Sequence, residues 1–348
     1  MKALILAAGF AVGLGLSFWP GVEKPKPWWW RATVAGILTL MIVLALYPPT
    51  AGTFRDAVIV GRMDSTKTVP VLVNHLVSGG SVVIVDGKQH VTVRDDNGRD
   101  ITVITSPEDG KTVGRMMPLI LDLRRAGADD VFECERIAAV FPGLTLPYIV
   151  GLEERARNLY FHVPMSWIAI LAYLYALIYG VKYLAGRDLT HDVRSASAAA
   201  LGTVFCVLAT ATGAVWAKFN WGSFWNWDPR QTSIFVLLLI YAAYFVLRAS
   251  VENEHQRAKL SSAYSILAGV TAPFFVYIAP RLYEGLHPGS ADDVNAGPVL
   301  SPQADALNLL KQIILSLAFA GFTALFFWLL GLAIRIRRAE AALEPAEE

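Results

Sequence analysis

Long apolar runs constrain the fold of this chain more than any other feature of its sequence. A helix needs roughly 20 apolar residues to cross the hydrocarbon core of a bilayer. Six runs reach or approach that length, at about 32–49, 163–185, 197–217, 231–248, 261–280 and 307–334. Charged residues make up only 17% of the chain, whereas soluble domains are typically about a quarter charged. The sequence therefore excludes a soluble enzyme and predicts an all-α polytopic membrane protein.

A seventh apolar run, at about 3–19, is shorter than the others. Lys2 precedes it, as a basic residue precedes the core of a signal peptide, but no small-residue cleavage site lies before Pro20. We therefore expect a retained helix, with a signal-peptide core as the alternative. The predicted fold has six or seven transmembrane helices.

Basic residues at the ends of the runs predict the orientation, because cytoplasmic connections carry an excess of Lys and Arg. The richer set of connections contains Lys24, Lys26, Arg31, Lys182, Arg187, Arg194, Arg248, Arg257, Lys259, Arg335, Arg337 and Arg338. The opposite connections carry fewer basic residues near the runs, chiefly Lys218, Arg230 and Arg281. We therefore expect 50–162, 218–230 and 281–306 on the outer face.

The region 50–155 has a different composition and predicts a small α/β domain inserted on the outer face. β-branched residues cluster in Ser81 to Val85, Val91 to Arg94 and Ile101 to Thr105, and Asp86-Gly87 is a hairpin turn signal. Met116 to Ala126 has the spacing of an amphipathic helix. The chain then divides into N-terminal membrane helices (1–49), the insert (50–155), a membrane core (156–335) and a cytoplasmic tail (336–348).

Charge and cysteine content exclude further classes of protein. The net charge is +1, so the chain lacks the bulk positive charge of a nucleic-acid-binding protein. Cys134 lies in a polar region and Cys206 in an apolar run, without metal-type spacing. We therefore expect neither a disulfide framework nor a thiol redox pair.

Aromatic residues crowd the outer connection between two of the predicted spans. The candidate platform consists of Trp216, Trp221, Phe224, Trp225 and Trp227. One interpretation is an aromatic belt, because Trp is enriched at the membrane interface. A belt needs only one or two such residues per helix end, whereas a wide platform suits a large, flat apolar ligand that stacks on the rings. We favour the platform, with Trp221, Trp225 and Trp227 as its main contributors.

Asp228 directly precedes Pro229 at the start of the next span. Asp is a good N-cap, and Pro at the first helical position loses no intrahelical hydrogen bond. We interpret Asp228 mainly as a cap that fixes the platform on a rigid helix, and ligand contact as the second possibility.

Two of the six histidines are candidates for ligands. His162 directly precedes one predicted span, and His287 follows another. Both are expected on the outer face near the tryptophans, whereas His191 and His255 lie on cytoplasmic connections and His75 and His90 in the insert. Two imidazoles beside an aromatic platform are the arrangement that holds a haem. The alternative is two unrelated interfacial histidines.

The two carboxylates of a haem need cationic partners. Lys218, Arg230 and Arg281 are the candidates on the outer face. Each of them could instead anchor a lipid phosphate.

The segment Trp221-Gly-Ser-Phe-Trp225-Asn-Trp227-Asp228-Pro-Arg-Gln-Thr232 resembles the WWD signature of the haem-handling membrane proteins of cytochrome c biogenesis. The Phe161-His162-Val-Pro164 stretch is similar to the segment with the first periplasmic histidine of the CcmC branch. Leu286-His287-Pro288 falls where that branch carries its second. The resemblance covers about 155–335.

This resemblance implies a protein of the bacterial inner membrane that holds haem b on the periplasmic side, with His162 and His287 as axial ligands. It also implies transfer of the haem to a CcmE-type chaperone, together with a CcmD-type small subunit and a CcmA/CcmB-type transporter. The extra run at 3–19 and the insert depart from the pattern of the branch.

Two other functions compete with haem transfer. The CcsA branch, which attaches haem to apocytochrome, carries additional histidines within its membrane helices, and the predicted spans here contain none. A membrane transporter with an interfacial Trp-rich loop is the alternative from another class. Transporters usually place ionisable residues at mid-membrane or break their helices there, and these spans are nearly free of charge.

Overall fold

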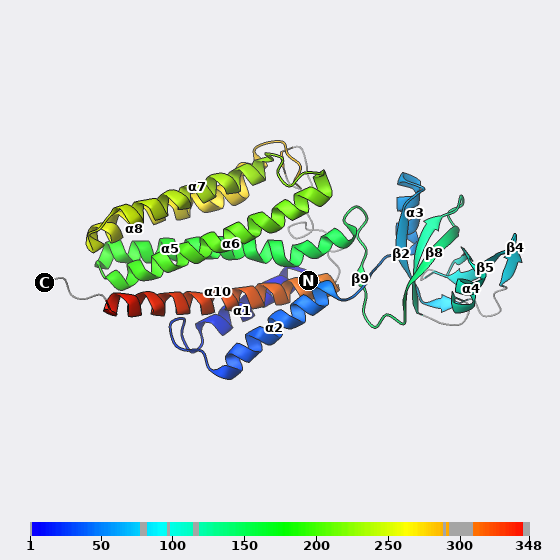
Figure 1. Cartoon of the computed structure of the whole chain (residues 1–348), viewed down its shortest axis with the longest axis horizontal. Helices are drawn as coiled ribbons and strands as arrows, with labels where there is room; N and C mark the ends of the chain where they lie inside the picture. The colour runs from blue at the N-terminus through cyan, green and yellow to red at the C-terminus, as the bar shows by residue number, and fades with distance from the viewer. Residues whose placement is uncertain are drawn as a thin grey trace. The chain divides into compact units, whose positions relative to one another are not determined.

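The computed structural model describes residues 2–76, 82–95, 98–113, 118–287, 290–291 and 309–343. The chain divides into two compact units, one formed by Met1–Ile42 with Arg157–Glu348 and the other by Val43–Ala156. Figure 1 shows that the first unit is a bundle of long helices and that the second contains the β-sheet. In sequence, the sheet unit is therefore an insertion into the helical unit.

The helical unit consists of long apolar helices. They are α1 (Lys2–Phe18), α2 (Trp28–Leu46), α5 (Leu159–Gly186), α6 (Leu189–Trp221), α7 (Pro229–Ser250), α8 (Glu254–Pro273) and α10 (Leu309–Leu343). Among the described residues, six helical segments are long and apolar enough to cross a membrane, and α1 is a shorter apolar helix. The prediction of a multi-pass helical membrane protein is confirmed.

Polar residues cap the starts of α6 and α8, which begin before the apolar runs that they contain. The Asp188 carboxylate accepts a hydrogen bond from the backbone N–H of Thr190 at the start of α6, and Asn253 caps α8 through Gln256. At its other end α6 finishes on Gly222 in the left-handed conformation, with φ +81°, which glycine adopts without strain. One expectation changes because α5 begins at Leu159: His162 lies in its first turn and does not precede the helix.

The last helix, α10, packs against both parts of the bundle. It contacts α1, α5 and α6, and it contacts α2 through Trp30, whose ring lies edge-on to that of Trp328. Gly9 and Gly13 allow α1 to approach α10 closely, since a Cβ on either would lie within 3 Å of α10 atoms. Trp30 of α2 is fully buried against Ala324 of α10.

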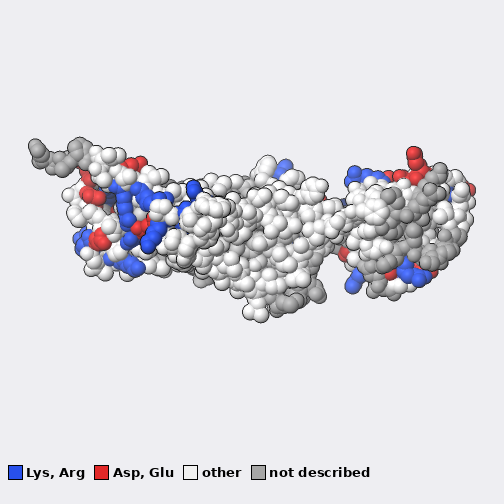
Figure 2. All heavy atoms as spheres, turned by 90° about the horizontal axis from the view of Figure 1, so that it is seen from below, with Lys and Arg blue, Asp and Glu red and all other residues white. Residues whose placement is uncertain are grey.

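Charged residues tie several connections together at one end of the bundle. The Glu23 carboxylate, between α1 and α2, pairs with Arg194 of α6 at 2.5 Å and with Arg338 of α10 at 2.7 Å. Arg248 of α7 pairs with Asp192 of α6 at 2.7 Å. Figure 2 shows basic side chains gathered at the end of the bundle that carries the C-terminal part of α10. The connections joined by these ion pairs all belong to the group that the sequence showed to be rich in Lys and Arg.

The second unit is a mixed sheet with a helix against it. Its elements are β1 (Thr50–Ala51), α3 (Phe54–Met63), β2 (Thr68–Val73), β3 (His75–Leu76), β4 (Val83–Val85), β5 (Lys88–Arg94), β6 (Asp100–Thr105), α4 (Pro107–Val113), β7 (Leu119–Arg125), β8 (Val131–Val140), β9 (Leu146–Pro147) and the 3₁₀ turn η1 (Glu153–Asn158). Among the described strands, the larger sheet has the order β2-β7-β8-β6-β5-β3, with β4 also on β5, and within it only β6 and β8 pair in parallel. β1 and β9 form a separate two-stranded parallel sheet. The predicted hairpin is present, because β4 and β5 pair antiparallel across Asp86-Gly87.

The predicted amphipathic helix at Met116 to Ala126 is wrong. Its described part is the strand β7, which pairs with β2 on one edge and β8 on the other. Leu119, Leu121 and Leu123 are fully buried in the core of this unit. Pairing on both edges satisfies the backbone hydrogen bonds of the segment. Together with the burial of its leucines, this pairing outweighs the local helical preference of the leucines and arginines.

Candidate functional site

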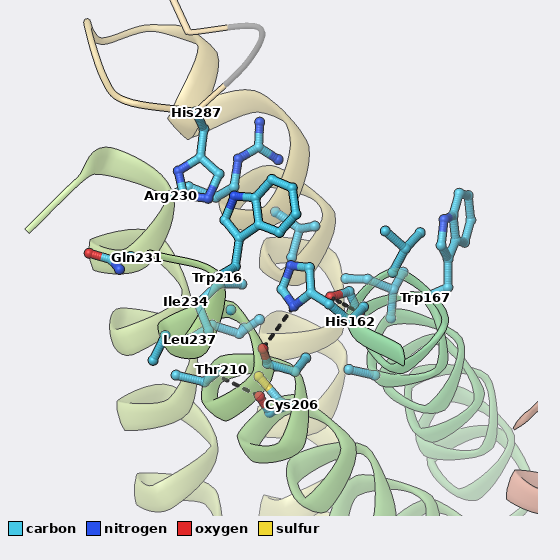
Figure 3. A pocket seen from close by; sticks show the side chains of 18 of the residues that line it. His162, Trp167, Cys206, Thr210, Trp216, Arg230, Gln231, Ile234, Leu237 and His287 are labelled. Atoms are coloured by element: carbon cyan, nitrogen blue, oxygen red, sulfur yellow. Dashed lines mark hydrogen bonds between the residues drawn. The ribbon is translucent and has the colours of Figure 1, made fainter. Parts of the chain in front are cut away.

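A cavity of about 260 Å³ lies inside the helical unit. Its walls come from α5, α6, α7 and the π-helical turn η2 (Phe274–Ile278) that continues α8, and His287 completes them. Five residues that the sequence singled out line it: His162, Trp216, Trp225, Arg230 and His287. Figure 3 shows both imidazoles and the Trp216 indole in this cavity. The two histidines, 125 positions apart in the numbering, therefore share one site.

The backbone of α6 fixes the ring of His162. Its Nδ1 lies 2.9 Å from the carbonyl oxygen of Ala209 and 3.2 Å from the hydroxyl of Thr212. Gly213 provides the space for this ring, since a Cβ there would lie 2.9 Å from Cε1 of His162. The imidazole thus packs against α6 at Gly213, where a side chain on α6 would clash with the ring.

The carboxylate of Asp228 fixes the ring of His287. Nδ1 of His287 lies 2.7 Å from Oδ1 of Asp228, and the indole of Trp221 packs edge-on against the imidazole with a centroid separation of 4.6 Å. The backbone N–H of Leu286 donates to the same carboxylate at 2.7 Å. Asp228 also caps α7 by accepting from the N–H of Arg230. The predicted N-cap is present. The same carboxylate also binds His287, which was not predicted.

Burial by itself would raise the pKa of Asp228. The hydrogen bond from His287, the charge of that ring and the N–H groups of Arg230 and Leu286 outweigh burial and lower the pKa to about 2. Asp228 is therefore a carboxylate at neutral pH and can only accept hydrogen bonds.

The hydrogen bonds of the two rings determine which nitrogen is available to a ligand. A carbonyl and a carboxylate only accept, so Nδ1 of each histidine carries the proton. In a neutral imidazole, Nε2 then keeps its lone pair, which is the form that binds a metal ion. Metal-binding histidines usually donate their other N–H to such an acceptor. In their neutral form, both site histidines could therefore offer Nε2 to a metal ion.

The aromatic residues of the predicted platform fall into two groups. Trp216 and Trp225 line the cavity. Trp221 does not line it but packs against His287, which does. Phe224 and Trp227 lie outside it with side chains 56% and 67% exposed. Trp227 has a positive φ of 53°, which is unusual for a bulky residue and typical of functional loops.

Three cationic residues were candidates for binding carboxylates. Arg230 lines the cavity, and its Nε is buried without a hydrogen-bond partner among the described residues. Arg281 donates to the backbone carbonyl of Tyr277, a lining residue. Lys218 instead donates to the carbonyl of Gly222 at 2.9 Å and caps α6. Arg230 has the best position of the three to bind an anion inside the cavity.

Sequence reasoning missed Gln231, which holds the loop between α6 and α7. Its side-chain oxygen accepts from the N–H of Asn226 at 2.8 Å, and its Nε2 donates to the carbonyl of Phe224 at 3.3 Å. Gln231 is buried and lines the cavity. The sequence offered one signal for Gln231, its position within the Trp-rich motif. Its hydrogen bonds to Asn226 and Phe224 form only in the folded loop.

The other candidate features lie away from the cavity. His191 is beside Arg194, and the exposed His255 is in the first turn of α8. His90 is in β5 of the second unit, and Pro288 is outside the described residues. Across the described part of the chain, no group of three or more His, Cys, Asp or Glu could hold a metal ion by itself.

Comparisons with known proteins match a region of the chain that contains this site. The family model of CcmC, described as heme exporter protein C, matches residues 138–344. Heme exporter protein C of Paracoccus denitrificans is 32% identical over 194 residues, which are 55% of this chain and 78% of that protein. The protein of the same name from Rhodobacter capsulatus is 29% identical over 246 residues, which are 68% of this chain and 93% of that protein. The matched region of the family model spans more than half of the chain and contains both site histidines and the Trp-rich loop, so this chain belongs to the CcmC family of heme exporter proteins.

Proposed function

We propose that the chain binds haem b in the cavity and passes it to a haem chaperone during cytochrome c maturation. The observation that carries this proposal is the pair His162 and His287, which line one cavity with Nδ1 of each ring already used as a donor. Two available Nε2 atoms match the two axial positions of a haem iron. The names of the relatives, which are heme exporter proteins, support the same cargo.

The surrounding residues fit the rest of a haem molecule. Trp216 and Trp225 offer aromatic surface to a porphyrin. The buried Nε of Arg230, without a partner among the described residues, suits a haem carboxylate. Asp228 holds the His287 ring in orientation and does not touch the ligand in this proposal.

The site includes residues at the end of the bundle opposite the basic cluster of Arg194, Arg248 and Arg338. If that cluster faces the cytoplasm, as basic residues generally do, the site faces the periplasm of a bacterial inner membrane. A CcmE-type chaperone would then receive the haem there, with a CcmD-type subunit and a CcmA/CcmB-type transporter as partners.

The visible spectrum of the purified protein tests haem binding. We expect a Soret band in the wild-type protein from haem-replete cells, and a shifted spectrum with weaker haem retention in both His162→Ala and His287→Ala. Added imidazole should partly restore the spectrum by filling the position left by the removed ring. His90→Ala and His255→Ala are the matched controls and should retain the wild-type spectrum. Wild-type spectra for both site variants would exclude His162 and His287 as ligands.

Labelling in intact cells tests the orientation. Lys88 is exposed in β5 of the second unit, and Lys182 is exposed near the end of α5. An impermeant thiol reagent should label Lys88→Cys in spheroplasts, and label Lys182→Cys only after the membrane is opened. The reverse pattern would place the second unit in the cytoplasm and overturn the proposed orientation.

A further inference from the structure

A line of buried polar side chains leads from the cavity towards the opposite end of the bundle. On α7, Leu237 lines the cavity, and Tyr241, Tyr244 and Arg248 follow it at the spacing of one helix face. Both tyrosines are fully buried. A membrane helix usually buries apolar residues at such positions, so this face of α7 requires an explanation.

The line begins at the wall of the cavity on α6. Cys206 lines the cavity, and the hydroxyl of Tyr173 lies beside its thiol. The same hydroxyl lies 3.3 Å from the hydroxyl of Thr203. The Tyr173 ring stacks on the Tyr241 ring with a centroid distance of 3.6 Å and an angle of 13°. This stack links the polar residues of α5 and α6 to those of α7.

The line ends at an ion pair. Arg248 binds Asp192 of α6 through two hydrogen bonds of 2.7 and 2.9 Å, and its guanidinium lies 5.9 Å from the centre of the Tyr244 ring. Ser195, one turn from Asp192, lies 3.4 Å from Ser265 of α8. Polar groups from three helices therefore converge at this level.

Several hydroxyls along the line are buried without a partner among the described residues. The hydroxyls of Tyr241, Tyr244 and Ser261 have no hydrogen bond there, although that of Tyr244 lies beside Arg248. Ser261 lies one turn from Ser265 on α8. Buried polar groups in proteins are generally satisfied by protein groups or by internal water. Such hydroxyls are especially unfavourable in a membrane-spanning bundle, where lipid offers no partner.

We propose that internal water fills this line and connects the wall of the cavity to the Asp192–Arg248 pair. The water would bridge the hydroxyls of Tyr173, Tyr241 and Tyr244 and give the cavity proton exchange with the end of the bundle opposite the Trp-rich loop. A proton taken up at one end is matched by one released at the other, so the path needs no further reactant. The path does not depend on which ligand the cavity binds.

Radiolytic hydroxyl-radical labelling of the full chain in lipid nanodiscs, without added haem, tests the proposal. Radicals formed from bound water modify adjacent side chains even where bulk solvent has no access. We expect Tyr241 and Tyr244 to be modified several-fold faster than Phe326 and Phe327, which are equally buried. Tyr183 is a second control, because it is buried with its hydroxyl bonded to the carbonyl of His255 at 3.1 Å.

A conservative variant tests whether the water forms one connected line. Tyr244→Phe removes one hydroxyl and should reduce the labelling of Tyr241 several-fold, whereas Tyr183→Phe should leave it unchanged. Labelling of both tyrosines at the rate of Phe326 would overturn the proposal, and so would labelling of Tyr244 alone, because the line would then stop short of the cavity. These outcomes leave the haem-binding test unaffected, since no haem is present.

Discussion

Nδ1 of His287 donates a hydrogen bond of 2.7 Å to the carboxylate of Asp228, a residue 59 positions earlier in the chain. The same carboxylate caps α7 and accepts from the backbone N–H of Leu286. Gly285 permits this contact, because a Cβ there would lie 2.8 Å from Oδ2 of Asp228. One side chain therefore couples the start of α7, the Trp-rich loop and the second histidine.

Removing the Asp228 carboxylate should weaken haem binding more than a lost helix cap explains. Loss of the cap costs about 1 kcal/mol, whereas loss of a partner that orients a metal ligand typically costs about 10–100-fold in affinity. Asp228→Ala should show both effects in haem titrations followed at the Soret band. Asp188→Ala removes only the cap of α6 and should keep the wild-type affinity. Equal losses of affinity in the two variants would contradict a role of Asp228 in orienting His287.

The contribution of Asp228 to stability should depend on pH only in acid. Its pKa is about 2 in the folded protein against an ordinary value of 3.8, so the folded state favours the carboxylate. That contribution, on the order of 2 kcal/mol, is fully present above about pH 4 and is lost as the pH falls through about 2. The difference in unfolding free energy between the wild-type protein and Asp228→Asn should therefore shrink as the pH falls below about 4. A difference that stays the same down to pH 2 would show that another group is responsible.

A methyl group at position 213 should displace the His162 ring. The Cβ of Gly213→Ala would lie 2.9 Å from Cε1 of His162, and overpacking of this kind typically costs about 1–3 kcal/mol. We expect weaker haem retention and a changed spectrum at equal protein level. Gly36→Ala adds the same methyl group to α2 in open space and should leave the spectrum unchanged. Identical spectra for both variants would mean that the position of the ring does not depend on Gly213.

The tryptophans should differ in their contribution to haem retention. Burial and stacking of a large aromatic side chain are worth roughly 1–3 kcal/mol, and only a ring in the cavity wall can supply them. Trp216→Ala should therefore release haem faster than Trp227→Ala, because Trp216 lines the cavity and Trp227 is 67% exposed outside it. Haem dissociation to apomyoglobin measures the difference. Faster release from Trp227→Ala would locate the haem on the outer surface of the loop.

Replacing Gln231 should loosen the Trp-rich loop. Gln231→Leu leaves the N–H of Asn226 and the carbonyl of Phe224 without their partner, and an unsatisfied buried group costs about 1–3 kcal/mol. Hydrogen exchange of residues 222–228 should become faster. Gln256→Leu, at an exposed position in α8, is the control and should not change exchange in this segment. Unchanged exchange in Gln231→Leu would show that other contacts hold the loop.

The sequence alone was sufficient for the features that depend on local composition. Each membrane helix is a run of apolar residues, and its length follows from the thickness of the bilayer, so six spans were predictable without any contact information. The hairpin at Asp86-Gly87 was predictable because its turn residues have positive φ, 49° and 77°, which such residues favour. The Trp-rich motif and the two histidine segments also identified the family from residues next to one another in the chain.

Tertiary structure decided the features that depend on residues far apart in the chain. The segment around Leu121 became a strand because β2 and β8 pair with it on both edges, which its own spacing could not reveal. The sequence grouped Trp216 with Trp227, but only helix packing sends one into the cavity wall and leaves the other exposed. The acceptors of the two imidazoles, Ala209 and Asp228, lie 47 and 59 positions from their histidines. Hydrogen bonds and burial depend on distance in space, so the form of the site was fixed only when α5, α6 and α7 packed together.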